Sequence, residues 1–259
     1  MSDIKEWFEE GRLTLLPEVD STNNYAKALA VKGAPHGSIV IAETQTAGKG
    51  RMGRRFVSPK GTGLYMTLIL RPDCAADKLT LLTPLAAVAA ANAVDRVCGV
   101  DTGIKWVNDV YLNGRKFVGI LTEGTFRGDR VDYALMGIGV NVGSIKGLMP
   151  EDIAPFVTSI EDETGVKYPI GKIASEISGE VERLLSQLRS GEFIKTYRDK
   201  SCVIGREVRV TRYTPCRTGK AVGIAHNGGL TVQYPDGSVE IVMSGEAEVI
   251  KQKDTAFYK

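Results

Sequence analysis

Residues 44–63, TQTAGKGRMGRRFVSPKGTG, are the most informative stretch of this chain. Five glycines and five cations share the segment, and no Asp or Glu occurs between Glu43 and Asp73. Glycine allows backbone conformations that are closed to other residues. Lys and Arg side chains this close together repel one another unless an anion lies among them. The segment, called the basic loop below, is therefore predicted to close on a negatively charged group.

The basic loop has two other possible interpretations. A basic run that contains glycine is most often a solvated surface loop. Gly48-x-Gly50-x-x-Gly53 also matches the dinucleotide-binding fingerprint, which needs a helix that opens at its glycines. Pro59 and Gly61 stop any helix that starts here. The dinucleotide interpretation fails, and a bound phosphate would have to be neutralised by side chains.

Apolar segments on both sides of the basic loop predict strands over residues 38–43 and 64–70. Upstream, a strand is expected over 12–20 and a helix over 22–31. Downstream, the alanine- and leucine-rich stretch 76–97 predicts a long helix, with Pro84 in its first turn or at a break between two helices.

From residue 104 to residue 142 the pattern predicts successive hairpins, because Asn113-Gly114 between apolar runs is a strong hairpin signal. Residues 150–201 are predicted to be helical. Short alternating strands then follow, typical of a small β-barrel. The fold class is α+β, with a mostly antiparallel central sheet packed with helices. Two domains are expected, 1–201 and 202–259.

Composition excludes several classes of function. Hydrophobic residues at 43% and charged residues at 25% are ordinary for a soluble enzyme, and a net charge of +2 argues against a general nucleic-acid binder. Four scattered cysteines and two histidines predict neither a zinc site nor a histidine-based triad. The N-terminus has no apolar signal core, and residues 79–94 are too short and polar to span a bilayer. We expect a cytoplasmic protein that binds no membrane.

A second informative stretch is KWVND at residues 105–109, followed by a hairpin that reaches Lys116. The hairpin is predicted to bring Lys105, Asp109 and Lys116 close together. Taken singly, such a lysine is usually exposed, and such an aspartate usually bonds to its own turn. Beside the basic loop, however, these residues offer cations for phosphates and one carboxylate for a hard metal ion.

Together these motifs resemble those of the biotin–protein ligases, also called biotin–acetyl-CoA-carboxylase ligases. The resemblance covers most of the chain, from Val19 to about Val249. Five segments are similar to family motifs and follow in order: DSTN at 20–23, AETQTAGKGRMGR at 42–54, KWVND at 105–109, GRKFVGILTE at 114–123 and GIGVN at 137–141. The resemblance implies the catalytic fold of this family, which is like that of class II synthetases, and an SH3-like C-terminal barrel.

The resemblance also implies roles for individual residues. The catalytic residues would be Lys116, Arg51 and Arg54. Biotin would be bound by Ser21, Thr22, Asn23, Gln45, Gly48, Lys49, Arg51 and Lys116. ATP and the adenylate would be bound by Lys49, Arg51, Arg54, Phe56, Lys105, Asn108, Asp109, Lys116, Gly119, Gly137, Gly139 and Asn141. Asp109 would lie near Mg²⁺, which is held through the ATP phosphates.

Four positions depart from the family pattern. Lys49 stands where the family usually has Arg, so the charge survives and the planar fork is lost. Met52 and Phe56 replace a basic residue and Trp, and Val107 replaces Pro. None of these changes removes a group that the chemistry requires, but they bear on substrate affinity and on the rigidity of the loop.

The implied reaction activates biotin as biotinyl-5′-AMP and transfers it to a lysine of a biotin carboxyl carrier domain. Two alternatives remain: a lipoate or octanoate–protein ligase of the same fold, and a nucleic-acid-binding module. Some members of the family also bind DNA through an N-terminal domain. Only about 18 residues precede the DSTN segment, so no DNA binding is expected. The acceptor protein, the role of the barrel and the oligomeric state, including a homodimer, stay open.

Overall fold

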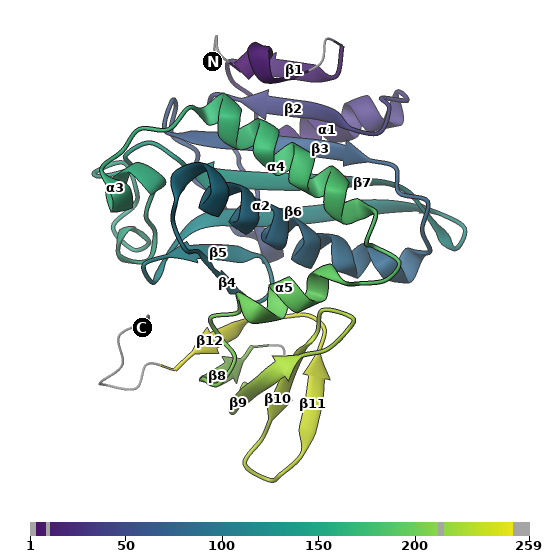
Figure 1. Cartoon of the computed structure of the whole chain (residues 1–259), viewed down its shortest axis with the longest axis vertical. Helices are drawn as coiled ribbons and strands as arrows, with labels where there is room; N and C mark the ends of the chain where they lie inside the picture. Colours follow the sequence, from purple (N-terminus) through teal and green to yellow (C-terminus); the bar gives the residue numbers. More distant parts are fainter. Residues whose placement is uncertain (1–3, 9–10, 212–214, 251–259) are drawn as a thin grey trace.

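The computed structural model of the chain describes residues 4–8, 11–211 and 215–250, with Trp7 described for its backbone alone. Its larger sheet has seven strands in the order β1-β2-β3-β7-β6-β5-β4 (Figure 1). The strands are β1 (Leu13–Leu16), β2 (Ser38–Ala42), β3 (Gly63–Leu70), β4 (Gly103–Lys105), β5 (Asp109–Leu112), β6 (Arg115–Arg127) and β7 (Arg130–Asn141). The β1–β2 pair is parallel and the other pairs are antiparallel, which confirms the predicted sheet.

Alternation along β3 gives the large sheet two different faces. Leu64, Met66 and Leu68 belong to the main hydrophobic core, whereas Ile69 packs in a smaller cluster with alanines of the first helix. Side chains point alternately to opposite faces of a strand, so Tyr65 lies on the same face as Ile69. This second face is covered by a single helix and carries the site described below.

Within the described residues, five α-helices pack on the sheet and beside it. They are α1 (Thr22–Val31), α2 (Leu82–Cys98), α3 (Ile160–Thr164), α4 (Ile170–Leu185) and α5 (Phe193–Asp199). α1 contacts β2, β3 and β7, while α2 and α4 pack on each other and cover the main core (Figure 1). The part of the chain that the structure describes also contains four short 3₁₀ helices: η1 (Ile4–Trp7), η2 (Arg51–Gly53), η3 (Ala76–Leu81) and η4 (Ala154–Phe156).

The predicted long helix over 76–97 is divided in two. η3 leads directly into α2, and Pro84 lies in the first turn of α2, where its missing N–H costs no hydrogen bond. The apolar helical span extends beyond residues 79–94 to Ala76–Cys98, which is long and apolar enough to cross a membrane by length and composition alone. It is nevertheless a core helix, because residues 85–91 are fully buried within the fold.

The C-terminal strands form a separate five-stranded antiparallel sheet in the order β11-β10-β9-β8-β12. They are β8 (Glu207–Val210), β9 (Arg217–Ile224), β10 (Leu230–Gln233), β11 (Val239–Val242) and β12 (Ala247–Val249). The alternating pattern predicted the first four, and β12 was missed because three residues are too few to show a period. The division at residues 201 and 202 stays a prediction, and the second sheet starts at Glu207.

Candidate active site

The basic loop folds into a small hairpin. Gln45 and Lys49 form isolated bridges with Ser58 and Arg55, respectively. A Cβ atom on Gly48 would lie 2.4 Å from the carbonyl oxygen of Phe56, so this crossing of the two arms needs glycine. The segment is thus a hydrogen-bonded hairpin and not the open loop that its composition suggested.

The tip of this hairpin is η2, and its cations reach two other parts of the chain. Arg51 Nη1 donates to Asn108 Oδ1 at 3.2 Å, and its Nη2 lies 3.4 Å from the carbonyl oxygen of Gly245. Arg54 Nη2 forms an ion pair of 2.7 Å with Glu246 Oε2. Since Gly245 and Glu246 directly precede β12, the small sheet supplies part of the site.

The β5–β6 hairpin supplies the opposite side of the site. Lys116 Nζ lies 2.7 Å from Asp109 Oδ1, and no described residue makes a hydrogen bond of good geometry to that buried oxygen. Asn108 is fixed to β6, because its Nδ2 donates to the carbonyl oxygen of Ile120 at 2.9 Å. This confirms that the hairpin brings Asp109 and Lys116 together.

The turn before β5 is held by two other parts of the chain. The Trp106–Val107 peptide bond is cis even though Val107 is not a proline, the residue that the family usually has at this position. Trp106 Nε1 donates to the carbonyl oxygen of Gly228 in the C-terminal sheet, and Tyr197 Oη of α5 donates to that of Val107. The turn that presents Asn108 and Asp109 is therefore anchored on both sides.

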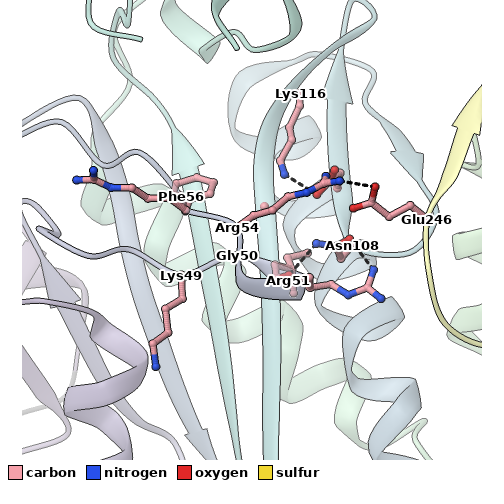
Figure 2. Close-up of a pocket in the computed structure, with 12 residues that line it drawn as sticks. Lys49, Gly50, Arg51, Arg54, Phe56, Asn108, Lys116 and Glu246 are labelled. Atoms are coloured by element: carbon pink, nitrogen blue, oxygen red, sulfur yellow. Dashed lines mark hydrogen bonds and ion pairs between the residues drawn. The ribbon is translucent and has the colours of Figure 1, made fainter. Parts of the chain in front are cut away.

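The loop tip and the hairpin line a cavity of about 100 Å³, the phosphate-side cavity (Figure 2). It is lined by Lys49, Gly50, Arg51, Arg54, Arg55, Phe56, Asn108, Asp109, Lys116, Gly119, Ile120 and Glu246. Five of these side chains are cationic, and Asp109 and Glu246 are its two carboxylates. Arg51 and Lys116, which are 65 positions apart in the chain, thus face the same space.

A second, smaller cavity of about 20 Å³, the α1-side cavity, adjoins the first. It is lined by Ser21, Thr22, Asn23, Gln45, Lys49, Phe56, Tyr65, Met66, Gly119, Leu121, Gly137, Ile138 and Gly139. Lys49, Phe56 and Gly119 line both cavities. The lining is a mixture of apolar side chains, glycines and a few polar groups, as expected of a pocket for a small organic ligand.

Phe56 lies against the sheet where the two cavities meet. A Cβ atom on Gly119 or Gly139 would come within 2.8 Å or 2.5 Å of its ring, so both positions leave room for the aromatic side chain. Its ring also meets Tyr65 edge to face, with 6.3 Å between centroids. Burial raises the pKa of Tyr65 to about 12, so this phenol stays neutral at physiological pH.

The start of α1 forms the polar end of the α1-side cavity. Ser21 is buried at the N-cap position, yet its side chain does not cap the helix. The Thr22 backbone N–H donates to Gln45 Oε1 at 2.9 Å, and the Thr22 hydroxyl lies 3.1 Å from the same oxygen. Gln45 Nε2 in turn donates to the hydroxyl of Ser58. These contacts fix the orientation of the Gln45 amide.

Three predicted site residues line neither cavity. Lys105 Nζ lies 3.4 Å from Tyr111 Oη and 5.6 Å from the centre of that ring. Asn141 is buried and donates from Nδ2 to the carbonyl oxygen of Thr158, while its Oδ1 has no hydrogen-bond partner among the described residues. Gly48 lies at the crossing of the two hairpin arms.

Lys49 lines both cavities but is largely exposed, and its side chain points away from the group around Arg51 and Lys116 (Figure 2). Sequence reasoning missed Glu246 and Tyr65. The period of β3 could have placed Tyr65 on the α1 face, whereas nothing local in the sequence marks Glu246. Its position depends on how the small sheet packs beside the large one.

Comparison with known proteins agrees with this geometry. Residues 15–141 match the Biotin/lipoate A/B protein ligase family, and residues 203–249 match the Biotin protein ligase C terminal domain. The bifunctional ligase/repressor BirA of Bacillus subtilis is 36% identical over 234 residues, which are 89% of this chain and 72% of that protein. The biotin–[acetyl-CoA-carboxylase] ligase of Paracoccus denitrificans is 34% identical over 233 residues, 86% of this chain and 95% of that protein.

Solved structures show the same fold. The biotin protein ligase from Aquifex aeolicus in complex with biotin and ATP has a TM-score of 0.79 at 27% identity, over 93% of this chain and 100% of that chain. The enzyme from Leishmania major in complex with biotinyl-5-AMP has a TM-score of 0.64 at 26% identity, over 90% and 99% of the two chains.

These similarities extend over both sheets, and the motifs that they cover build the two adjoining cavities. They confirm the α+β fold and the C-terminal domain that the motifs implied. The chain is an ATP-dependent ligase that belongs to the biotin protein ligase family.

Proposed function

We propose that this chain uses the α1-side cavity for biotin and the phosphate-side cavity for ATP. It would join the two substrates as biotinyl-5′-AMP and transfer the biotinyl group to a lysine of a biotin carboxyl carrier domain. One observation carries the proposal: Arg51 and Lys116 line one cavity, and that cavity adjoins a second one of mixed apolar and polar lining.

The lining of the α1-side cavity has the chemistry to hold a small bicyclic ligand with a polar ring and an apolar chain. Thr22 and Gln45 provide polar groups at one end, and Met66, Leu121 and Ile138 provide an apolar wall. The carboxylate at the end of the apolar chain would then reach Phe56 and Gly119, where the two cavities meet. The Aquifex aeolicus biotin protein ligase, which has the same fold, has been solved in complex with both biotin and ATP.

The phosphate-side cavity has to overcome repulsion between two anions. The biotin carboxylate attacks the α-phosphate of ATP, and two unit charges 4 Å apart repel by about 4 kcal/mol at an effective dielectric of 20. Arg51 and Arg54 can hold phosphate oxygens through both nitrogens of a planar fork. Lys116 belongs to the β5–β6 hairpin. We assign its ammonium group to the phosphate oxygens that gain negative charge as the bond between the biotin carboxylate and the α-phosphate forms.

The residues present fit a magnesium ion that is held mainly by ATP. No group of three or more His, Cys, Asp or Glu side chains gathers in the described part of the chain. Mg²⁺ in nucleotide sites commonly uses one or two carboxylates and the substrate phosphates. Asp109, with its buried oxygen, would be that carboxylate, and the ion would neutralise phosphate charge.

In the second half-reaction the carrier lysine attacks the mixed anhydride and AMP leaves. The adenylate is lost to hydrolysis if water enters, so the site has to cover it. The hairpin tip and the segment before β12 lie over the phosphate-side cavity and are joined by the Arg54–Glu246 ion pair. We assign this cover the task of excluding water from the intermediate.

The proposal is tested by exchange of labelled pyrophosphate into ATP, measured with biotin, lipoate or octanoate as the acid. Exchange with biotin alone is expected, and exchange with lipoate or octanoate alone would establish the alternative function. Incubation with biotin, ATP, Mg²⁺ and a carrier domain, followed by mass spectrometry, should then show a biotinyl group on the carrier lysine. An unmodified carrier would overturn the transfer step.

A further inference from the structure

Four side-chain oxygen atoms form a row that runs from the buried interior to the α1-side cavity. Asn23 Oδ1 lies 2.7 Å from Thr67 Oγ1, which lies 2.9 Å from Thr22 Oγ1, and this hydroxyl lies 3.1 Å from Gln45 Oε1. Thr67 is completely buried on β3 and lines neither cavity. The other three residues all line the α1-side cavity.

The oxygen atoms at both ends of this row can only accept hydrogen bonds. Asn23 Nδ2 donates to Glu123 Oε2 at 2.7 Å and lies 3.4 Å from the carbonyl oxygen of Leu121. Because these two partners only accept, the amide oxygen of Asn23 has to face Thr67. At the other end, the Thr22 backbone N–H donates to the amide oxygen of Gln45.

The row of four oxygen atoms therefore has one hydrogen atom too few for its three contacts. Three oxygen–oxygen contacts need three hydrogens, and the two hydroxyls supply only two. An oxygen–oxygen contact without a hydrogen is least unfavourable where the atoms are farthest apart, which is the 3.1 Å contact between Thr22 and Gln45. Thr67 then donates to Asn23, and Thr22 donates inward to Thr67.

We propose that Thr67 is a positioning residue that sets the hydrogen-bonding character of the biotin pocket. Because Thr67 accepts the hydroxyl hydrogen of Thr22, the side-chain oxygens of Thr22 and Gln45 are both able to accept a hydrogen bond from a ligand in the cavity. A ligand that brings an N–H group to this point supplies the missing hydrogen. A ligand that brings an oxygen atom there adds a further repulsive contact.

This inference rests on the proposed biotin function, because the ureido ring of biotin carries two N–H groups on a small planar unit. It predicts discrimination against cyclic carbamate analogues, in which an oxygen atom replaces one ureido N–H without a change in ring size. Two such analogues exist, one for each ureido nitrogen. The analogue whose oxygen faces Thr22 is the informative one.

The test compares Thr67→Val with Thr67→Ser. Valine has the shape of threonine without its hydroxyl, and serine keeps the hydroxyl. In Thr67→Val the hydrogen of Thr22 is free to point to Gln45 or into the cavity, so one acceptor is lost and a donor becomes available. Thr102→Val is the matched control, because the hydroxyl of Thr102 is also buried but has no hydrogen-bond partner in the described structure.

Binding of biotin and of both carbamates is measured by titration calorimetry, and the KM for ATP is measured in parallel. The full-length wild type is expected to bind one carbamate about 100-fold more weakly than biotin. In Thr67→Val, biotin should bind about tenfold more weakly, and its advantage over that carbamate should shrink to about tenfold or less. Thr67→Ser should keep the full preference, and ATP should be unaffected in both variants, which also shows that they are folded.

Two results would overturn the inference alone: a full preference for biotin in Thr67→Val, or an equal loss of preference in Thr102→Val. Equal losses for biotin and both carbamates in Thr67→Val would likewise show a merely structural role. A wild type that binds no biotin would refute the proposed function itself, and the positioning role of Thr67 with it.

Discussion

Arg54, at the tip of the basic loop, forms an ion pair of 2.7 Å with Glu246, which directly precedes the last strand of the C-terminal sheet. The two residues are 192 positions apart in the chain, and both line the phosphate-side cavity. The carboxylate pairs with an arginine that we assign to the ATP phosphates, and it adds negative charge to the cavity that we assign to them.

Glu246→Gln is therefore expected to lower the KM for ATP by about threefold to tenfold, with unchanged affinity for biotin. Steady-state kinetics at low salt measure the effect, which should shrink near 0.5 M salt, where charges are screened over roughly 4 Å. Glu248→Gln is the control, because Glu248 lies on β12, two residues after Glu246, and also pairs with an arginine, Arg209, outside both cavities. An identical KM for ATP in the two variants would contradict this role of Glu246.

Lys116→Met should slow formation of the adenylate by about 10²–10³, the usual cost of losing one positioned donor in a site that excludes water. Release of pyrophosphate in a single turnover is the measurement. Arg115→Met removes the neighbouring cation, which pairs with Glu163 and lines neither cavity, and it should leave the rate near wild type. A rate for Lys116→Met within about threefold of wild type would refute the assignment.

Asp109→Asn should raise the Mg²⁺ concentration needed for half-maximal activity by about tenfold, because an amide keeps the shape of the carboxylate and loses its charge. Activity is titrated with MgCl₂ at saturating ATP and biotin. The fully exposed Asp101 provides the control variant Asp101→Asn. If both variants follow the wild-type magnesium curve, Asp109 has no part in holding the ion.

Gly139→Ala should weaken binding of both biotin and ATP by about tenfold, because the new Cβ would lie 2.5 Å from the ring of Phe56 and force it to move. Adding Phe56→Leu should restore part of the loss by relieving the collision. Gly143→Ala is the control, since its Cβ would have no neighbour closer than 3.5 Å. Calorimetry on wild type, the two single variants Gly139→Ala and Phe56→Leu, the double variant and Gly143→Ala measures both affinities. Additive losses in the double variant would exclude the collision.

Acid stability should depend on Glu180, a buried carboxylate between α2 and α4. Hydrogen bonds from Arg183 and Asn92 outweigh the effect of burial and lower the pKa of Glu180 to about 2. A pKa lowered on folding stabilises the protein above the unfolded value of 4.5, and this contribution is lost as pH falls toward 2. Glu180→Gln should cost about 2 kcal/mol at pH 7, and its difference from wild type should shrink steadily as the pH falls from 4.5 toward 2.

The free energy of unfolding of wild type and Glu180→Gln is measured by urea titration from pH 2 to pH 7. Glu176→Gln serves as the control on the same helix, because Glu176 is partly exposed and pairs with Arg96 alone among the described residues. A difference between wild type and Glu180→Gln that stays constant with pH would show that the charge of Glu180 does not contribute to stability.

Local features of the sequence predicted most of the elements. The helix over 22–31, the hairpin at Asn113-Gly114 and the strands on both sides of the basic loop are all present, because each depends on residues within a few positions of one another. The motifs also identified most of the residues that line the two cavities. Period, turn chemistry and caps are local properties, so a single chain displays them.

The structure shows what depends on the folded arrangement of the chain. Lys105 and Asp109 are the two ends of one motif, yet the ammonium of Lys105 lies near Tyr111 and outside both cavities. Glu246 carries no local signal and enters the site through the packing of the second sheet.

By itself the sequence determined the strands, the helices, the basic loop and the groups available for chemistry, because these follow from short-range backbone preferences and side-chain type. Only the tertiary structure decided which groups meet. It joined Arg54 to Glu246, and it placed Thr67 behind Thr22. Such contacts form when sheets and helices pack. Because their partners are far apart along the chain, no local sequence pattern predicts them.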